Sequence, residues 1–117
     1  MKITTRNVGD IRILNCNGKI TMDGGGTLFL RNTLHDALQS GTHKIVIDLG
    51  HTKFIDRVGV DELVKAYDSV AHDGGEVRLL HLTKKISDPM VITKLMMTFK
   101  SYNDENAALA SFNELSV

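Results

Sequence analysis

Two strand-like runs on either side of an amphipathic helix, in the middle of the chain, constrain the fold more than any other feature. The run "HKIVIDLG" at 43–50 is short and rich in Ile and Val, which is typical of a well-buried central strand. The run "RVGVDELVKAYDSVAHDGG" at 57–75 places its apolar residues on one helical face and ends at two glycines, and "EVRLLHL" at 76–82 indicates the next strand. Because strands that alternate with helices need crossover connections, this order predicts an α/β fold with a mixed sheet.

The N-terminal part of the chain predicts a hairpin followed by a helix. "MKITTR" and "IRILNCN" are β-biased runs separated by "NVGD", which is typical of a hairpin loop. Asn17-Gly18 fits a type I′ turn, so a third short strand is expected to begin at "KIT". The run "GGGTLFLRNTLHDALQSG" repeats Leu at every fourth position and predicts a helix that stops at Gly41.

The C-terminal part predicts two more helices. Asp88-Pro89 is a favourable helix start, because Asp suits the cap and Pro suits the first helical position. The run "SYNDENAALASFNEL" predicts a final helix capped by Asn103 or Asp104, with a short edge strand before it. No linker, repeat or low-complexity tract interrupts the chain, so residues 1–117 are expected to form one domain.

The charge balance and the cysteine count exclude several classes of protein. Lys plus Arg and Asp plus Glu both number 14, so the neutral chain gives no reason to expect nucleic acid or an anionic membrane as a partner. The single cysteine, Cys16, cannot form an internal disulfide, and its apolar neighbours predict an unreactive core thiol. No signal peptide or membrane-spanning run is recognisable, so a cytoplasmic location is expected.

No group of residues shows the spacing of a catalytic or metal site. The five histidines form no convincing ligand pair at helical spacing, so no metal is expected. Asp48 and Asp56 flank a loop that lacks a nucleophile at fixed spacing, and Asp48 is interpreted as a hydrogen-bonding residue at a strand end. The glycines at 24–26 lack the Lys-Ser/Thr of a phosphate-binding loop, which favours a flexible helix entry. We therefore expect neither an enzyme nor a cofactor.

The stretch "TKFIDRVGVDEL" at 52–63 joins a strand to the central helix at one acidic residue. Asp56 is a good N-cap residue, and Asp61 and Glu62 suit the positive end of a helix. Arg57 opposes that dipole, and local helix physics gives no reason for a cation there. An exposed cation beside the apolar Val58 is typical of a contact surface, whereas the alternative is a pair of tolerated surface residues.

In their order and spacing, these pieces resemble a STAS domain of the bacterial anti-sigma factor antagonist type, over nearly the whole chain. "ITTRNVGDIRILNCNGKIT" is similar to the opening strands of the family, and "HKIVIDLGHTKFID" is similar to its central strand and the approach to its switch. "GVDELVKAYDSVAHDGGEVRLLHL" resembles the switch helix and the strand after it. "ITKLMMTFKSYNDENAALASF" resembles the C-terminal pattern of the family.

The resemblance implies a single STAS-like domain with a mixed β-sheet and about four helices packed mainly on one face. It implies no enzymatic activity. Members of the family bind an anti-sigma factor, usually a serine kinase, and so release a sigma factor for transcription. The kinase inactivates them by phosphorylating a serine at the start of the switch helix.

The phosphorylation motif is degenerate in this chain. The family pattern resembles Asp-Ser-Ser/Thr-Gly-Leu-Gly, and it stands here as Asp56, Arg57, Val58, Gly59, Val60 and Asp61. The phosphoacceptor position falls on Val58, which has no hydroxyl, so the usual addition of about two negative charges cannot occur there. Thr52 and Ser69 are the nearest candidates for phosphorylation at another site.

We expect a partner-binding surface around this junction, with Phe54 pointing inward. The expected members of the surface are Asp23, Gly24, Asp56, Arg57, Val58, Gly59, Asp61 and Glu62. The expected partner is an anti-sigma factor or a serine-kinase-like protein, bound by an antagonist that is not switched at the usual position.

Two alternatives remain open. The first is a scaffold subunit that contacts other STAS proteins in a signalling assembly. The second is a sensor that holds a small anion at Arg57 and the helix N-terminus. Three carboxylates stand against one guanidinium there, so a local charge of about −2 argues against the sensor.

Overall fold

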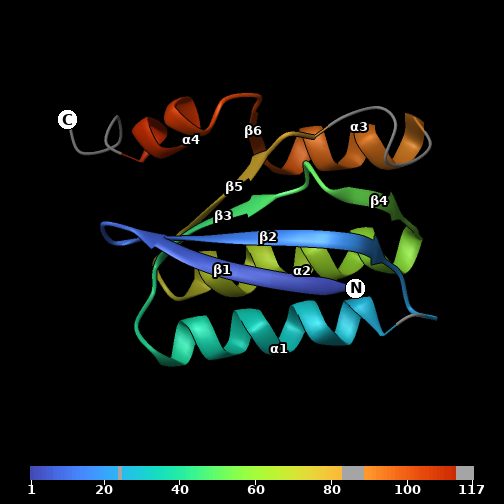
Figure 1. Cartoon of the computed structure of the whole chain (residues 1–117), viewed down its shortest axis with the longest axis horizontal. Coiled ribbons are helices and arrows are strands. Elements are labelled where there is room, and N and C mark those ends of the chain that lie inside the picture. Colours follow the sequence, from blue (N-terminus) through green and yellow to red (C-terminus); the bar gives the residue numbers. More distant parts are fainter. Residues whose placement is uncertain (24, 83–88, 113–117) are drawn as a thin grey trace.

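The computed structural model describes residues 1–23, 25–82 and 89–112. Its elements follow one another through the chain as shown in Figure 1. They are β1 (Lys2–Val8), β2 (Ile11–Ile20), α1 (Gly26–Gln39), β3 (Lys44–Asp48), β4 (Thr52–Ile55), α2 (Arg57–His72), β5 (Glu76–Leu80), α3 (Pro89–Thr98), β6 (Lys100–Tyr102) and α4 (Glu105–Ser111).

The strands of the described chain form one mixed sheet in the order β1-β2-β3-β5-β6, with β4 beside the far end of β2. The β1–β2 hairpin is antiparallel, and every other pairing is parallel, as the alternation of strands and helices predicts. The crossovers place β3 at the centre of the sheet, between β2 and β5. Its residues Ile45–Asp48 are all buried, which confirms the prediction of a central strand.

Several predicted boundaries are confirmed, because each is set by local chemistry. The hairpin loop contains Gly9 at a φ of 61°, and α1 ends just before Gly41 at a φ of 88°. Helix α3 begins at Pro89, while its expected cap, Asp88, lies outside the described residues. Helix α4 is capped by Asp104, whose side chain accepts a 3.1 Å hydrogen bond from the backbone N–H of Ala107.

The expected turn at Asn17-Gly18 is wrong. Strand β2 continues through both residues to Ile20, and the third short strand is the end of β2. Gly18 has a φ of 114°, and the register with β4 shifts between Gly18 and Lys19. The glycine therefore serves a bulge that lets one strand pair first with β3 and then with β4, a function that local sequence cannot distinguish from a turn.

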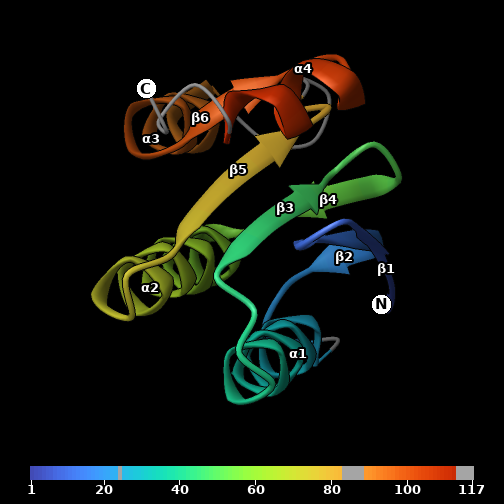
Figure 2. The same ribbon diagram turned by 90° about the vertical axis from the view of Figure 1, so that its left-hand side faces the viewer.

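The helices lie mainly on one face of the sheet, as expected. Helices α1, α2 and α3 share the larger apolar core with Leu14, Ile47 and Leu79 of the strands. Figure 2 shows α1 and α2 on the same side of the twisted sheet. Helix α4 covers part of the opposite face, where Ala108 and Phe112 pack against a second cluster. In β4, Thr52 and Ile55 are buried, whereas Lys53 and Phe54 are exposed to solvent.

Candidate interaction surface

The junction between β4 and α2 is built on Asp56. Its backbone is extended, with a φ of −89° and a ψ of −179°, and its Oδ1 accepts a 2.7 Å hydrogen bond from the backbone N–H of Gly59. Its Oδ2 accepts a longer hydrogen bond, 3.4 Å, from the backbone N–H of Met22 in the β2–α1 connection. Asp56 therefore caps α2 as predicted and also fixes the neighbouring loop against the helix start.

Gly59 allows the first turn of α2 to lie directly on the backbone of β2. A Cβ atom at this position would lie 2.1 Å from the carbonyl oxygen of Ile20, which is shorter than any real contact. A glycine at this position of the motif thus has a packing role. The close approach holds the next exposed residues, Arg57 and Val58, above the end of the sheet.

Arg57 and Val58 are exposed, as the contact-surface interpretation requires. The side chain of Val58 is 41% exposed, although it is a branched hydrocarbon. In the chain that the structure describes, the Arg57 guanidinium has no ion-pair or hydrogen-bond partner. Neither side chain contributes to the core, so nothing in the packing explains their presence at a helix start.

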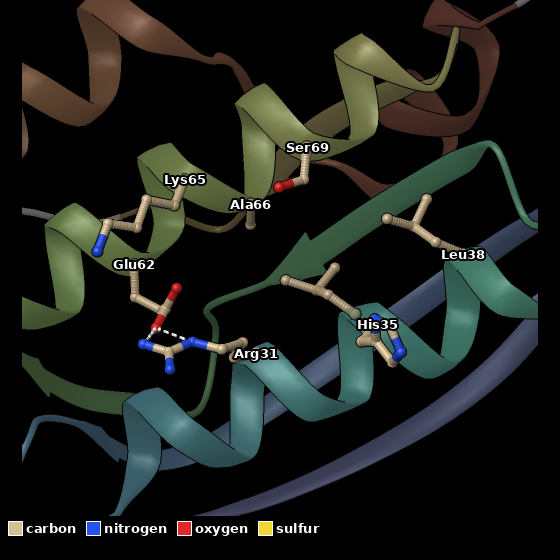
Figure 3. A pocket seen from close by; sticks show the side chains of 8 residues that line it. Arg31, His35, Leu38, Glu62, Lys65, Ala66 and Ser69 are labelled. Atoms are coloured by element: carbon tan, nitrogen blue, oxygen red, sulfur yellow. Dashed lines mark hydrogen bonds and ion pairs between the residues drawn. The ribbon is translucent and has the colours of Figure 1, made fainter.

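Two expectations for this region are wrong. Phe54 was expected to point inward, but it is 44% exposed, because Ile55 takes the core side of β4 and successive strand residues face opposite sides. Glu62 was expected in the exposed patch, but it is 6% exposed and lies on the α2 face that packs toward α1. There, Oε1 of Glu62 accepts hydrogen bonds from Nη2 and Nε of Arg31, at 2.6 and 2.9 Å (Figure 3).

The remaining predicted residues divide between two grooves. Asp23 is exposed and lines a groove beside the end of β2, together with Lys19 and Lys53. Asp61 lines a second groove, beside the start of α3, where its carboxylate lies 3.5 Å from Nζ of Lys94. Gly24 lies outside the described residues. Phe54 and Asp56 line both grooves and form the ridge between them.

We define the junction surface as the exposed side chains around this ridge. They are Lys19, Met22, Asp23, Lys53, Phe54, Arg57, Val58, Asp61, Met90 and Lys94. The methionines and lysines were not predicted as members, because they come from β2, the β2–α1 connection, β4 and α3 and meet only in the folded chain. The local charge of about −2 inferred from the sequence is also wrong, since Glu62 is neutralised by Arg31 and three lysines join the surface.

The two proposed phosphorylation positions differ in access. Thr52 is buried, and its hydroxyl donates a 2.7 Å hydrogen bond to the carbonyl oxygen of Cys16. Ser69 is exposed, and it lines a shallow groove between α1 and α2 together with His35 and Lys65 (Figure 3). A kinase could reach Ser69 without unfolding, whereas Thr52 would first have to leave the core.

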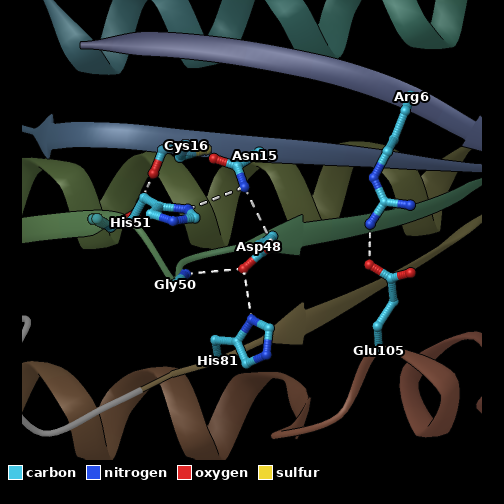
Figure 4. Close-up of polar contacts among 9 residues, drawn as sticks. Arg6, Asn15, Cys16, Asp48, Gly50, His51, His81 and Glu105 are labelled. Carbon is cyan, nitrogen blue, oxygen red and sulfur yellow. Dashed lines mark hydrogen bonds and ion pairs between the residues drawn. The ribbon is translucent and has the colours of Figure 1, made fainter.

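A polar cluster occupies the carboxyl ends of β3 and β5 (Figure 4). Asp48 is 7% exposed, and its Oδ1 accepts from the backbone N–H of Gly50 and pairs with Nδ1 of His81, both at 2.9 Å. Its Oδ2 lies 3.4 Å from Nδ2 of Asn15. These contacts confirm Asp48 as a hydrogen-bonding residue at a strand end. A second imidazole, that of His51, joins the cluster through a 3.4 Å contact between its Nδ1 and Nδ2 of Asn15.

The thiol of Cys16 is fully buried beside this cluster. Burial, and to a smaller extent the negative charge of Asp48, raise the pKa of Cys16 to about 12. The core position of Cys16 is confirmed, and the raised pKa disfavours the thiolate, which is the reactive form.

The described residues contain no group of three or more His, Cys, Asp and Glu side chains that could hold a metal ion. None of the described helices combines the length and the apolar composition needed to cross a membrane. The grooves at the junction are open and are lined by charged and apolar side chains. The arrangement is therefore suited to binding another macromolecule.

The chain belongs to the STAS domain family, whose model matches residues 2–108. Among solved structures, an anti-sigma factor antagonist from Mycobacterium paratuberculosis superposes with a TM-score of 0.79 at 20% identity, covering 94% of this chain and 92% of that one. SpoIIAA of Bacillus in its unphosphorylated form gives a TM-score of 0.73 at 12% identity, covering 97% and 98%. A chain of the stressosome, described as a signal integration and transduction hub, gives 0.70 at 15%, covering 97% and 98%.

At these identities the structural likeness establishes the fold alone. No curated protein sequence matches the chain. The fold is therefore a STAS domain with a mixed six-stranded sheet in the described part of the chain.

Proposed function

We propose that this STAS domain is a non-enzymatic regulatory module of the anti-sigma factor antagonist kind. It binds an anti-sigma factor or a serine-kinase-like protein through the junction surface and so regulates sigma-factor-dependent transcription in the cytoplasm. Unlike a phosphorylation-switched antagonist, it binds constitutively or is controlled by its abundance.

One observation carries the proposal. Val58 occupies the second residue of α2, is 41% exposed, and presents a hydrocarbon to solvent where the family motif has a hydroxyl. The capping architecture beneath it is intact, with the Asp56 carboxylate on the N–H of Gly59. These features support an exposed contact surface at a position whose side chain cannot receive phosphate. Residues 56–61 contain no hydroxyl at all.

The test is capture of partners from the native cell with the full chain as bait. A matched bait carries Arg57→Ala and Val58→Asp, which place a negative charge on the surface and remove a cation. We expect a kinase-like partner on the first bait and its loss from the second. Equal capture by both baits would place the partner elsewhere on the domain.

The purified partner then tests the missing switch. With ATP, the unmodified chain should receive no phosphate at residues 56–61, whereas Val58→Ser restores an acceptor and should be phosphorylated by a partner that is a serine kinase. Stoichiometric phosphate on Ser69 of the unmodified chain would show that the switch has moved to the exposed end of α2.

A scaffold is the second candidate. The similarity to a chain of the stressosome favours it, because that structure is described as a signal integration and transduction hub. A scaffold of this kind would contact other STAS proteins, so mixing experiments with purified STAS domains would distinguish it from an antagonist that captures a kinase-like protein.

A further inference from the structure

Exposed apolar side chains gather on the junction surface. Met22, Phe54, Val58 and Met90 are 62%, 44%, 41% and 81% exposed. They come from the β2–α1 connection, β4, α2 and α3, so only the fold brings them together. Exposed apolar groups concentrated in one region, with a charged rim, are characteristic of a protein interaction site, and methionine adapts to irregular partner surfaces.

Phe54 divides this surface into two receptive grooves. The groove on the β2 side has a volume of about 670 Å³, and the groove on the α3 side has a volume of about 650 Å³. Both are open to solvent, and Phe54 and Asp56 line both. Side chains from a single partner segment could enter the grooves on either side of the phenyl ring, which would become buried between them.

The charges that remain uncommitted around the grooves are mainly positive. Within the described residues, the side chains of Lys19, Lys53 and Arg57 have no ion-pair or hydrogen-bond partner. Two of the acidic side chains already have partners, since Asp56 caps α2 and the Asp61 carboxylate lies 3.5 Å from Nζ of Lys94. The groups left to attract a partner are thus three cations against one free carboxylate, that of Asp23.

We infer that the partner segment at this surface is apolar and acidic. Its apolar side chains enter the grooves on either side of Phe54, and its carboxylates face Lys19, Lys53 and Arg57. The inference rests on the proposed function and adds the chemistry of the partner to it. Nucleic acid would satisfy the cations but not the apolar grooves, and a basic segment would bring like charges together.

The experiment uses three synthetic peptides of about 15 residues, which is about four helical turns. The first carries a Leu stripe flanked by Glu, the second has Lys in place of every Glu, and the third has Ser in place of every Leu. Each is titrated into the ¹⁵N-labelled full chain, together with a single-stranded oligonucleotide as a competitor. We expect saturable amide shifts at residues 53–61 and 90–94 with the first peptide only.

Variants make the assignment specific. The double variant Lys53→Glu with Arg57→Glu should weaken binding of the acidic peptide by about tenfold, and it should then bind the Lys peptide more tightly than the acidic one. Phe54→Ser should weaken binding of the acidic peptide by about tenfold or more. Met97→Ser changes an exposed methionine near the end of α3, and Lys100→Glu changes the exposed first residue of β6; both should leave binding unchanged.

Tighter binding of the Lys peptide or of the oligonucleotide to the unmodified chain would overturn the inference. The inference would also be overturned if Lys53→Glu with Arg57→Glu left the affinity for the acidic peptide unchanged. The proposed function fails separately, if a captured partner binds with no effect of Arg57→Ala and Val58→Asp. A partner whose binding at the junction surface is unchanged by Lys53→Glu with Arg57→Glu would be consistent with the proposed function. It would contradict only the inference that the partner segment is acidic.

Discussion

Nη2 of Arg31 lies 2.6 Å from Oε1 of Glu62, and this ion pair joins α1 to α2 across the groove between the two helices. The two ends of the pair are unequal, because the Glu62 side chain is 7% exposed and that of Arg31 is 59% exposed. The carboxylate has given up most of its water and depends on the guanidinium for compensation.

Removing Arg31 alone should therefore cost more stability than removing both partners of the pair. Arg31→Met leaves a buried carboxylate without its donor and should lower the free energy of unfolding by about 2 kcal/mol. The double variant Arg31→Met with Glu62→Leu replaces the pair with apolar groups and should recover most of that loss. Urea unfolding of both variants and of Glu62→Leu alone gives the coupling energy. Simple additivity of the single effects would show that the pair contributes nothing as a unit.

The close approach of Gly59 to Ile20 predicts a larger loss of stability for a substitution in the first turn of α2. Gly59→Ala places a Cβ 2.1 Å from the Ile20 carbonyl oxygen, and only movement of α2 away from β2 can relieve the clash. We expect a loss of about 3 kcal/mol or more in the free energy of unfolding.

Val58→Ala is the matched control for that substitution. It lies one residue earlier in the same helix turn, at a side chain that is 41% exposed, and it should change stability by less than about 0.5 kcal/mol. Thermal and denaturant unfolding measure both variants. A mild effect at Gly59 would mean that the helix start can shift without cost, and that the junction surface is not rigidly placed.

Parts of the fold that depend on local chemistry could be predicted from the sequence. Asp56 was predicted as a cap, and Asp104 as one of two candidates with Asn103, because a short polar side chain before an apolar helical stripe satisfies free N–H groups. Gly41 and Pro89 indicated a helix end and a helix start for reasons of backbone geometry. The STAS family was recognised from the order of such pieces.

Features that depend on contacts between distant segments could not be predicted. Glu62 looked like an ordinary acid in a first turn, and its burial follows from Arg31, which is 31 residues away. Phe54 looked like a core residue, but Ile55 takes the core side of β4 and leaves Phe54 exposed on the other side. The bulge at Gly18 exists because β2 pairs with two strands in succession.

The junction surface shows the same limit. Arg57 and Val58 are exposed as the sequence predicts, because they are consecutive residues at the start of one helix. The sequence did not predict Met22, Met90 or Lys94, which join that surface from the β2–α1 connection and α3. As a result the sign of the local charge was wrong.

The buried thiol of Cys16 predicts a loss of stability at alkaline pH. The ordinary pKa of this group is 9.0, and the folded chain raises the pKa of Cys16 to about 12, mainly through burial. Between these values the unfolded state binds fewer protons than the folded state, so stability falls as pH rises through this window. The contribution should be on the order of 1 kcal/mol near about pH 10.

Cys16→Ala isolates that contribution, because other groups also titrate in the same range. The difference in unfolding free energy between the unmodified chain and the variant should be constant below about pH 8.5 and should shrink above it. A difference that stays constant to about pH 11 would show that the thiol titrates equally in both states. Labelling of Cys16 by a thiol reagent at neutral pH should correspondingly be slow until the chain is unfolded.

Small anions are expected not to bind at the N-terminus of α2. The cations of the junction surface would attract them, but the Asp56 carboxylate already accepts from the N–H of Gly59 at 2.7 Å and stands where a phosphate would bind. A helix dipole equivalent to about half a charge cannot offset that fixed negative group. We predict no binding of phosphate, ATP or GTP tighter than about 1 mM at physiological salt. Titration of each compound while the amide shifts of residues 55–62 are followed provides the measurement. Saturable micromolar binding centred there would contradict the prediction and would favour the anion sensor over the protein-binding module.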